Sequence, residues 1–272
     1  MNDQVENDAP PAGGRVAVIT GAGSPTGIGA ACARALAPTH RLVVAATSPR
    51  IEDRVRELRD LGADAFGFVG DLSVSATADA LVAEAIERWG RVDALVNSAG
   101  MVATTGEEEQ SPAEQTTDEQ WRDLLARNLD TNFFVTRAAL APMVAQGYGR
   151  IVSIGSLSGA VMAYRGDAAY HAAKAGVVGL ARSIAVDHAA RGITCNVVAP
   201  GWIATGSSTE RERALGAATP AGRPGTPEEV ASLVAYLASP SASYLTGQVI
   251  VVDGGNSIDE EPFLHTPTGT LP

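Results

Sequence analysis

Apolar and polar positions along the chain form blocks of two kinds. Short runs rich in Val, Ile and Ala, with little strict alternation, are typical of strands buried on both faces of a parallel sheet. Longer segments carry apolar residues every three or four positions, which is the spacing of an amphipathic helix. The short runs predict strands at residues 15–20, 41–47, 65–72, 92–100, 149–156, 193–200 and 247–255. The longer segments predict helices at residues 27–37, 50–62, 76–90, 118–147, 168–192 and 227–239.

The order of these elements predicts the fold class. Strands alternate with helices, and helices that cross from one parallel strand to the next cover both faces of a sheet. We therefore expect an α/β fold, a single-domain doubly wound sheet of seven mostly parallel strands with helices on both faces. The long helical segment 118–147 contains Pro142, which is a candidate position for a bend.

The two ends of the chain differ from this central part. Residues 1–14, "MNDQVENDAPPAGG", are polar and contain Pro and Gly, so we expect a disordered arm. Residues 15–255 would form the domain. Residues 256–272 would be a C-terminal tail, because this stretch is too short to bury a core of its own. Residues 101–117 are polar and are expected to form a surface loop.

Composition and charge exclude several kinds of partner. The 272-residue chain has a formal net charge of −11 and a pI of about 4.8, which argues against binding to nucleic acid or anionic membranes. No apolar run reaches the roughly 20 residues needed to span a bilayer, and the first residues lack the features of a signal peptide. Cys32 and Cys195 have no partners at the spacing of a metal site or disulfide. We expect no metal, two buried thiols and a reducing, cytoplasmic location.

The stretch "TGAGSPTGIG" at residues 20–29 carries the first candidate chemistry. It lies between a predicted strand and a predicted helix, where free backbone N–H groups and the helix dipole attract phosphate. Glycine permits the tight turn and the close approach of a pyrophosphate. Gly21 and Gly27 are separated by five residues, so we expect a bulge at Ser24 and Pro25, with Thr20 still ending the strand.

Four motifs together resemble a known family. "TGAGSPTGIG", "NSAG" (97–100), "YHAAK" (170–174) and "APGWIAT" (199–205) follow in the order of the short-chain dehydrogenase/reductase family, over about residues 14–255. The resemblance implies a Rossmann fold, an NAD(P)(H) cofactor and oxidoreductase activity. The glycine loop is two residues longer than the family's usual Thr-Gly-x-x-x-Gly-x-Gly. A loop that begins at Gly23 instead would place Ala22 where the family has threonine, and Ser98 stands where the family usually has a second asparagine.

The second predicted strand bears on the choice of cofactor. It is followed by "AATSPR" (45–50), without the acidic residue that commonly binds the ribose 2′-hydroxyl of NAD. Thr47, Ser48 and Arg50 are candidates to bind a 2′-phosphate, which slightly favours NADP over NAD, although the glycine loop lacks the arginine often found in NADP-linked relatives. The full set expected to bind the cofactor is Gly21, Gly23, Thr26, Gly27, Ile28, Gly29, Thr47, Ser48, Arg50, Asp71, Leu72, Asn97, Ala99, Gly100, Tyr170, Lys174, Pro200, Gly201, Ile203 and Thr205.

Tyr170 and Lys174 are the candidate proton-transfer pair. They are four residues apart on a predicted helix and therefore share one face. A nearby ammonium group stabilises a phenolate, so Tyr170 is expected to be the general acid in reduction and the general base in oxidation. The resemblance implies that Lys174 also binds the nicotinamide ribose.

The resemblance adds two further catalytic residues. It implies that Ser156 positions and polarises the substrate carbonyl, with Ser158 as the competing choice. It also implies that Asn128 holds a water molecule linked to the lysine, with Asn132 as the alternative.

Substrate specificity is expected to lie around these residues. Candidates for the substrate pocket are Met101, Ser158, Met162, Tyr164 and Trp202, together with residues 206–222. They favour a compact aryl ketone or secondary alcohol, and the acidic surface tolerates an amino alcohol. The leading hypothesis is an enzyme acting on a free small molecule.

Two alternatives remain open. They are a 3-oxoacyl-[acyl-carrier-protein] reductase and a dinucleotide-sensing protein without turnover. The acidic charge disfavours an acidic carrier protein, and the complete catalytic set disfavours a sensor. The segment "YLTGQVIVVDGG" (244–255) resembles the family's last strand, which implies a homotetramer.

Overall fold

This computed structural model describes residues 14–100 and 112–260. Most of the expected N-terminal arm, part of the polar loop that begins at Met101, and the last twelve residues of the expected tail lie outside that range. The division of the chain into arm, domain and tail therefore stays a prediction.

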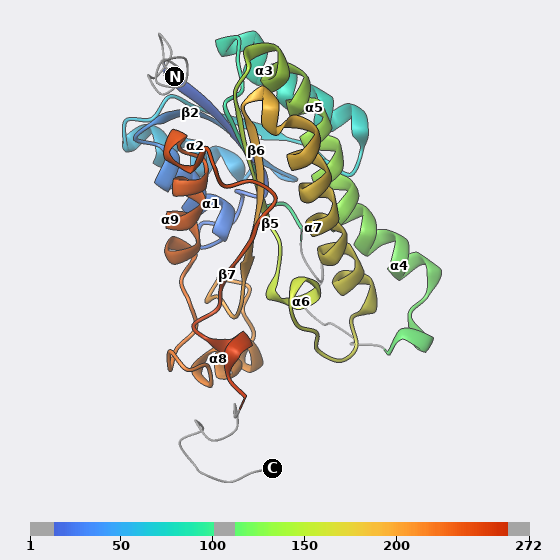
Figure 1. Ribbon diagram of the computed structural model, residues 1–272. Coiled ribbons are helices and arrows are strands. Elements are labelled where there is room, and N and C mark those ends of the chain that lie inside the picture. The colour runs from blue at the N-terminus through green and yellow to red at the C-terminus, as the bar shows by residue number, and fades with distance from the viewer. Residues whose placement is uncertain (1–13, 101–111, 261–272) are drawn as a thin grey trace.

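All seven predicted strands form one sheet (Figure 1). They are β1 (Arg15–Ile19), β2 (His40–Ala46), β3 (Ala65–Val69), β4 (Ala94–Asn97), β5 (Gly149–Ile154), β6 (Ile193–Pro200) and β7 (Val249–Val252), in the order β3-β2-β1-β4-β5-β6-β7. Every pairing is parallel over the described residues. Strands β1, β5 and β6 are buried along their whole length, which explains their continuous apolar runs.

Helices cover both faces of this sheet, as predicted (Figure 1). The helices are α1 (Ile28–Leu36), α2 (Ile51–Asp60), α3 (Ser75–Trp89), α4 (Asp118–Leu125), α5 (Thr131–Gln146), α6 (Leu157–Ala160), α7 (Ala168–His188), α8 (Glu210–Ala217) and α9 (Pro227–Leu237). Short 3-10 turns lie at Ala113–Gln115, Ala189–Arg191, Pro240–Ala242 and Asn256–Ile258. One core packs α1, α2 and α9 against the sheet, and the other packs α3, α5 and α7.

The two thiols lie one in each core. Cys32 belongs to the core beside α1, and Cys195 belongs to the core beside α7. Both are free and buried, and burial raises the pKa of each thiol to about 12. The expectation of buried cysteines is therefore confirmed, and neither thiol has the lowered pKa of a reactive nucleophile.

The structure differs from the predicted helices in three places. The segment 118–147 is interrupted by a π-helical turn, Ala126–Asp130, while Pro142 lies inside α5. A π-turn inserts one residue into the helical repeat, which the spacing of apolar residues does not reveal. Helices α6 and α8 were not predicted, because α6 is a single irregular turn and α8, "ERERALGA", has almost no apolar face.

The strand order positions a binding crevice. Successive strands run outward from β1 toward β3 in one direction and from β4 toward β7 in the other. In doubly wound sheets, ligands bind at the carboxyl ends of the strands where this direction changes. The glycine loop follows β1, and residues 98–100 follow β4, so both meet at this point.

Candidate active site

A cavity of about 700 Å³ opens at this edge of the sheet. Its lining comes from the loops after β1, β4, β5 and β6, from α7 and from α8. The expected residues that line it are Gly21, Gly27, Ile28, Gly29, Gly100, Ser156, Ser158, Met162, Tyr164, Tyr170, Lys174, Pro200, Gly201, Trp202, Ile203 and Thr205. The expected residues that do not line it are Gly23, Thr26, Thr47, Ser48, Arg50, Asp71, Leu72, Asn97, Ala99 and Asn128. Met101 lies outside the described residues.

Two glycines of the loop permit close backbone contacts. Gly21 has φ +67°, and a Cβ atom there would lie 2.5 Å from the Ser98 carbonyl oxygen. A Cβ atom on Gly29 would lie 2.5 Å from the Gly21 carbonyl oxygen. Helix α1 then begins with Gly27 as its N-cap, without a side-chain cap and without an acidic residue in its first turn. Its first N–H groups and its dipole can therefore bind an anion, as the pyrophosphate of a dinucleotide requires.

Thr20 anchors this loop to the neighbouring strand. It follows β1 directly, is buried, and its Oγ1 accepts hydrogen bonds from the backbone N–H groups of Ser98 and Ala99, each at 3.0 Å. The replacement of the family's second asparagine by Ser98 thus leaves these backbone bonds in place. The position of Thr20 supports a loop that begins at Thr20 rather than at Ala22.

The two extra residues of the glycine loop form a bulge, and a side chain of α1 binds it. The Pro25 carbonyl oxygen accepts a hydrogen bond from Arg34 at 3.1 Å, and Arg34 also pairs with Glu228 of α9 at 3.0 Å. The bulge brings Thr26 across the crevice, where its Oγ1 accepts from the Gly206 N–H at 2.9 Å. A Cβ atom on Gly206 would lie 2.5 Å from that oxygen. The longer loop therefore connects the glycine loop with the segment that leads to α8.

The expected adenosine-side residues lie beyond the cavity. Arg50 Nε donates to Ser48 Oγ at 3.4 Å, directly after β2. Asp71, after β3, accepts from the backbone N–H of Ser73 at 2.9 Å and from its hydroxyl at 2.7 Å, and these bonds lower the pKa of Asp71. Since β2 and β3 follow β1 toward the edge of the sheet, these groups lie on the β3 side of the glycine loop.

Lys174 and Tyr170 lie on one face of α7, as their spacing predicts. The Lys174 Nζ is 5.6 Å from the centroid of the Tyr170 ring and donates to the Ile154 carbonyl oxygen at 3.1 Å. Lys174 is only 5% exposed, and burial lowers the pKa of its ammonium group to about 8. The hydrogen bond to β5 holds the amine beside the tyrosine at the cavity floor.

Asn128 converges on the same place from the π-turn. It is buried and donates to the Leu124 carbonyl oxygen at 3.1 Å. A Cβ atom on Gly100 would lie 2.6 Å from Asn128 Oδ1 and 3.5 Å from Lys174 Nζ, so all three groups lie close together. The π-turn thus explains how an asparagine of a surface helix reaches the lysine.

The alternative asparagine, Asn132, has a different environment. Its Oδ1 accepts from the Ser153 hydroxyl at 3.3 Å and from Asn97 Nδ2 at 3.5 Å. The Asn97 amide also donates to Thr136 Oγ1 at 2.8 Å. These residues form a buried polar cluster between β4, β5 and α5. The cluster favours Asn128 over Asn132 as the residue near Lys174, and it directs the Asn97 side chain toward α5.

Ser156 and Ser158 both line the cavity. Ser156 is the N-cap of α6, and its Oγ accepts from the Ser158 backbone N–H at 3.1 Å. This bond uses a lone pair of Ser156 and leaves its hydroxyl proton for another acceptor. Gly159 has φ +84°, and a Cβ atom there would lie 2.4 Å from the His171 carbonyl oxygen, so this glycine lets the serine turn pack against α7 beside Tyr170.

Tyr164, an aromatic residue of the cavity lining, is held in place by two neighbouring side chains. The Tyr164 hydroxyl donates to Asp167 Oδ2 at 2.7 Å. The rings of Tyr164 and His171 meet edge to face with centroids 4.6 Å apart. The sequence predicted Tyr164 as a pocket residue but gave no sign of these supporting contacts.

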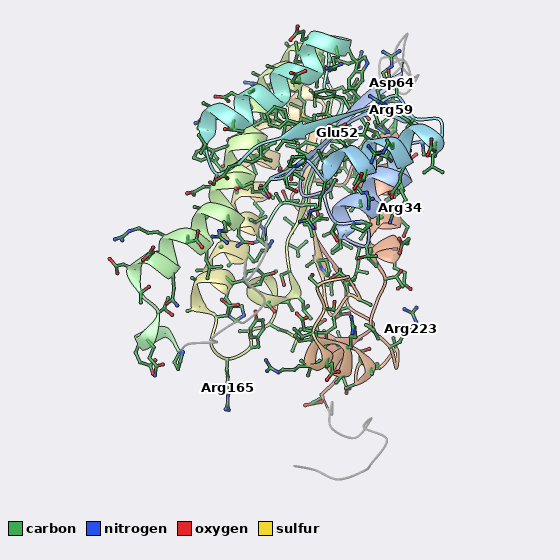
Figure 2. The ribbon with its side chains drawn as sticks, turned by 180° about the vertical axis from the view of Figure 1, so that it is seen from behind. Arg34, Glu52, Arg59, Asp64, Arg165 and Arg223 are labelled. Atoms are coloured by element: carbon green, nitrogen blue, oxygen red, sulfur yellow. The ribbon has the colours of Figure 1, made fainter. Side chains whose placement is uncertain are left out.

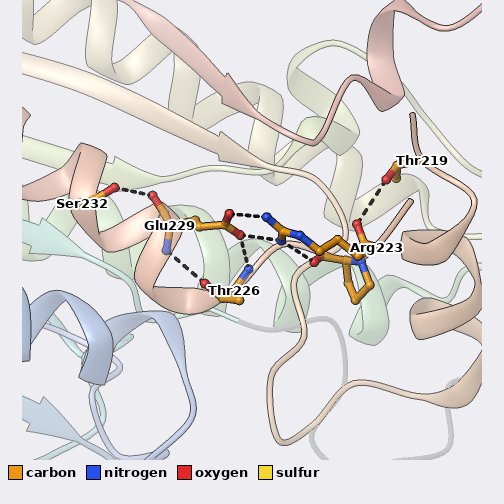
Figure 3. Close-up of polar contacts among 6 residues, drawn as sticks. Thr219, Arg223, Thr226, Glu229 and Ser232 are labelled. Atoms are coloured by element: carbon orange, nitrogen blue, oxygen red, sulfur yellow. Dashed lines mark hydrogen bonds and ion pairs between the residues drawn. The ribbon is translucent and has the colours of Figure 1, made fainter. Parts of the chain in front are cut away.

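Helix α8 contributes Glu212 and Leu215 to the cavity lining, and the segment that follows it is bonded to α9. Figure 3 shows the contacts of this segment. Arg223 binds both carboxylate oxygens of Glu229 on α9, at 2.6 and 2.9 Å. Thr219 Oγ1 donates to the Arg223 carbonyl oxygen. The Gly225 N–H also donates to the Trp202 carbonyl oxygen at 2.9 Å. These contacts fix where α8 lies over the site.

Comparison with known proteins agrees with this geometry. Residues 21–257 match a family model described as enoyl-(acyl carrier protein) reductase. The chain belongs to the short-chain dehydrogenase/reductase family. It is 36% identical over 247 residues to 3-oxoacyl-[acyl-carrier-protein] reductase FabG of Escherichia coli, which covers 89% of this chain and 97% of the relative. It is 39% identical to cis-4-hydroxycyclohexanecarboxylate dehydrogenase of Sinomonas cyclohexanicum, with 89% and 96% covered.

Solved structures of this family have the same fold. Levodione reductase matches with a TM-score of 0.83 at 32% identity, covering 89% of this chain and 97% of that one. The protein named gox2181 matches with a TM-score of 0.83 at 38% identity, covering 90% and 96%. The expected Rossmann fold is confirmed, and the chain is an NAD(P)-dependent oxidoreductase acting on CH–OH or carbonyl groups.

Several lining residues were not predicted as site residues from the sequence. They are Ser24, Ser98, Ile154, Gly155, Leu157, Ala163 and Asn256, while Ser207, Ser208, Glu212 and Leu215 lie within the expected segment 206–222.

Among residues 14–100 and 112–260, no three His, Cys, Asp or Glu side chains gather as a metal site needs. None of the helices described combines the length and apolar character required to cross a bilayer.

Proposed function

We propose that this short-chain dehydrogenase/reductase interconverts a ketone and a secondary alcohol on a free small molecule, with NADP(H) preferred to NAD(H). The observation that carries the proposal is the convergence of Tyr170, Lys174 and Ser156 at one cavity with aromatic walls, with Asn128 next to Lys174. Such a constellation supplies a proton donor, a charge that stabilises its conjugate base, and a hydroxyl that orients a carbonyl.

The reduction needs one proton and one hydride, and a nicotinamide cofactor would supply the hydride when bound. Tyr170 transfers its phenolic proton to the carbonyl oxygen, and the Ser156 hydroxyl donates a hydrogen bond to that same oxygen. The Lys174 ammonium group, held by the Ile154 carbonyl, stabilises the phenolate that remains. Asn128 lies where it can orient a water molecule that returns a proton toward Lys174. Oxidation reverses each transfer.

The segment after β6 would hold the nicotinamide ring of the bound cofactor. Pro200, Gly201, Ile203 and Thr205 line the cavity and are the residues proposed to contact the nicotinamide carboxamide. A Cβ atom on Gly201 would lie 2.8 Å from Asp253 Cβ, so this turn packs directly on the segment after β7. A fixed ring position is required because hydride transfer depends on the distance to the carbonyl carbon.

The preference for NADP(H) rests on the groups after β2. No acidic residue occurs in "TSPR" (47–50), whereas Thr47, Ser48 and Arg50 offer two hydroxyls and a guanidinium group. Arginine is suited to bind phosphate through more than one N–H group. An acid at this position would repel a 2′-phosphate, and its absence supports the preference.

A 3-oxoacyl-[acyl-carrier-protein] reductase is the second candidate function. The observation that favours it is the identity of 36–38% to several reductases of that name. The formal net charge of −11 argues against docking of an acidic carrier protein.

A homotetramer is proposed as the assembly. The edge strand β7 is only half buried along its length, and Tyr244 and Ile258 nearby are exposed, which supports an interface on this side.

The test follows nicotinamide absorbance with NADPH and NADH in parallel. The substrates are aryl ketones, an acetoacetyl thioester of N-acetylcysteamine, and the same acyl group on a carrier protein. We expect reduction of aryl ketones with NADPH, and loss of more than about a thousandfold in the Tyr170→Phe variant. Reduction of the carrier-bound substrate alone would replace the proposal with the second candidate. Cofactor binding without turnover of any carbonyl would favour a sensor.

A further inference from the structure

The cavity lining contains two charged side chains among its described residues, and they have different environments. Lys174 is buried on the floor and bonded to Ile154. Glu212 projects from α8 at the side wall and is half buried. The geometry points to a substrate that carries a positive charge, an amine-bearing ketone or alcohol whose ammonium group is bound by Glu212. This inference rests on the proposed function.

The capping box that Glu212 forms does not itself require a negative charge. Glu212 forms a capping box with Thr209: its Oε2 accepts from the Thr209 N–H at 2.7 Å and from the Thr209 hydroxyl at 3.1 Å, and its own N–H donates to Thr209 Oγ1 at 3.2 Å. Glutamine serves a capping box as well as glutamate does. The capping contacts involve Oε2 and leave Oε1 available to a ligand.

Lys174, bonded to Ile154, is the one basic side chain in the cavity lining among the described residues, and no other basic side chain offsets the charge of Glu212. None of the ion pairs among the described residues includes Glu212. Arg165 points outward, away from the domain (Figure 2), and Arg223 is bound to Glu229 (Figure 3). Arg211 and Arg213 flank Glu212 in sequence, but neither lines the cavity. A ligand at this wall therefore meets a carboxylate without a competing base.

The aromatic side chains that line the cavity also suit a positively charged substrate. Tyr164 and Trp202 both line the cavity, and the Tyr164 ring is fixed by Asp167 and His171. Aromatic faces attract alkylammonium groups, and the attraction adds to that of a carboxylate. A substrate carboxylate at the same wall would face electrostatic repulsion from Glu212. Charge and wall chemistry thus select a cation over an anion.

The experiment compares three acetophenones that differ only in the para substituent. One carries a trimethylammonium group and is a permanent cation, the second carries a tert-butyl group and is the neutral isostere of the first, and the third carries a carboxylate. The catalytic efficiency, kcat/KM, is measured for each ketone at saturating NADPH in the wild type, Glu212→Gln and Glu210→Gln. The ratio of cation to isostere, compared between variants, cancels the intrinsic reactivity of each ketone. Glu210→Gln is the matched control, because Glu210 lies in the same first helical turn but does not line the cavity.

We expect Glu212→Gln to lower the ratio of cation to isostere about fivefold to tenfold, the scale of one charge contact in a half-exposed site. The catalytic efficiency toward the carboxylate-bearing ketone, relative to the isostere, should rise. Glu210→Gln should leave both ratios within about twofold. Thermal unfolding checks that α8 is intact, since the glutamine keeps the cap.

Other results separate this inference from the proposed function. An unchanged ratio in Glu212→Gln, or an equal fall in both variants, would overturn the inference while turnover of the isostere upholds the proposed function. If no ketone is turned over, the proposed function fails. The ratio of cation to isostere is then taken from the dissociation constants of the two ketones, measured calorimetrically on the NADPH-loaded protein. The same ratio in wild type and Glu212→Gln would overturn the inference in that case as well.

Discussion

Replacing Lys174 with methionine should stabilise the protein while it abolishes catalysis. Lys174 is 5% exposed, and burial lowers the pKa of its ammonium group from 10.5 to about 8. At about 1.36 kcal/mol per pKa unit, keeping this lysine charged in the folded state costs about 3 kcal/mol at pH 7. Methionine has a similar length and no charge, so Lys174→Met removes that cost.

A smaller loss opposes this gain. The Lys174 Nζ donates to the Ile154 carbonyl oxygen at 3.1 Å, and the variant leaves that oxygen without this donor. Removing the donor of a buried acceptor typically costs about 2 kcal/mol. We therefore expect the free energy of unfolding of Lys174→Met to exceed that of the wild type by about 1 kcal/mol at pH 7.

The pH dependence of the difference tests its cause. The lowered pKa means that the unfolded state binds the proton more tightly, so the cost in the wild type is complete below pH 8 and falls as pH rises from about 8 toward 10.5. At pH 10 the cost of charging is below about 1 kcal/mol, and the advantage of methionine should disappear.

The assay is urea-induced unfolding of both proteins at pH 7 and pH 10, at one protein concentration. A variant that is less stable at pH 7, or a difference that does not change with pH, would refute the electrostatic explanation. Lys174 is the only lysine in the sequence, so NMR of protein labelled with ¹³C at lysine Cε gives one side-chain resonance and reports this pKa directly.

Three further predictions concern the glycine loop and the opposite end of the sheet. Gly29→Ala should abolish cofactor binding in a fluorescence titration, because its Cβ would lie 2.5 Å from the Gly21 carbonyl oxygen; near-normal affinity would contradict the close approach. Thr26→Val should weaken cofactor binding about fivefold by removing the acceptor of the Gly206 N–H, whereas Thr26→Ser should bind normally; equal losses would point to packing instead. His40 is buried, and burial lowers its pKa to about 4, so it is neutral in the folded state and the stability this provides is complete above pH 6.5 and lost as pH falls toward 4. Between pH 7.5 and 5 the wild type should lose about 2 kcal/mol more than His40→Gln in urea unfolding; parallel losses would refute this assignment.

Much of the fold could be predicted because its signals are local. Strand β6 was predicted at its observed bounds, since the whole of "ITCNVVAP" is buried. The strand predicted at 92–100 is shorter, Ala94–Asn97, because the backbone of Ser98 and Ala99 turns to bind Thr20. The π-turn at Ala126–Asp130 leaves no mark in the spacing of apolar residues.

The candidate site also combines residues that local patterns predict with contacts that depend on the complete fold. The spacing of Tyr170 and Lys174 fixes their common helix face, so the sequence alone was sufficient to pair them. Asn128 could be chosen over Asn132 only by resemblance, because both lie in one helical segment and the π-turn separates their environments. The contacts of Asp167 and His171 with Tyr164 depend on how the α6 turn folds back on α7, which no local pattern encodes.

This division explains why the family identifies the chemistry but not the substrate. The cofactor cradle consists of backbone groups and glycines in short motifs that meet at one edge of the sheet, so those motifs suffice to predict it. The substrate wall depends on α8, which has almost no apolar face of its own. Its place over the cavity is fixed by long-range contacts, from Gly206 to Thr26 and from Arg223 to Glu229. A change in the contact between Arg223 and Glu229 would move Glu212 relative to Tyr170 without altering a family motif, so the motifs alone do not determine the charge of the substrate wall.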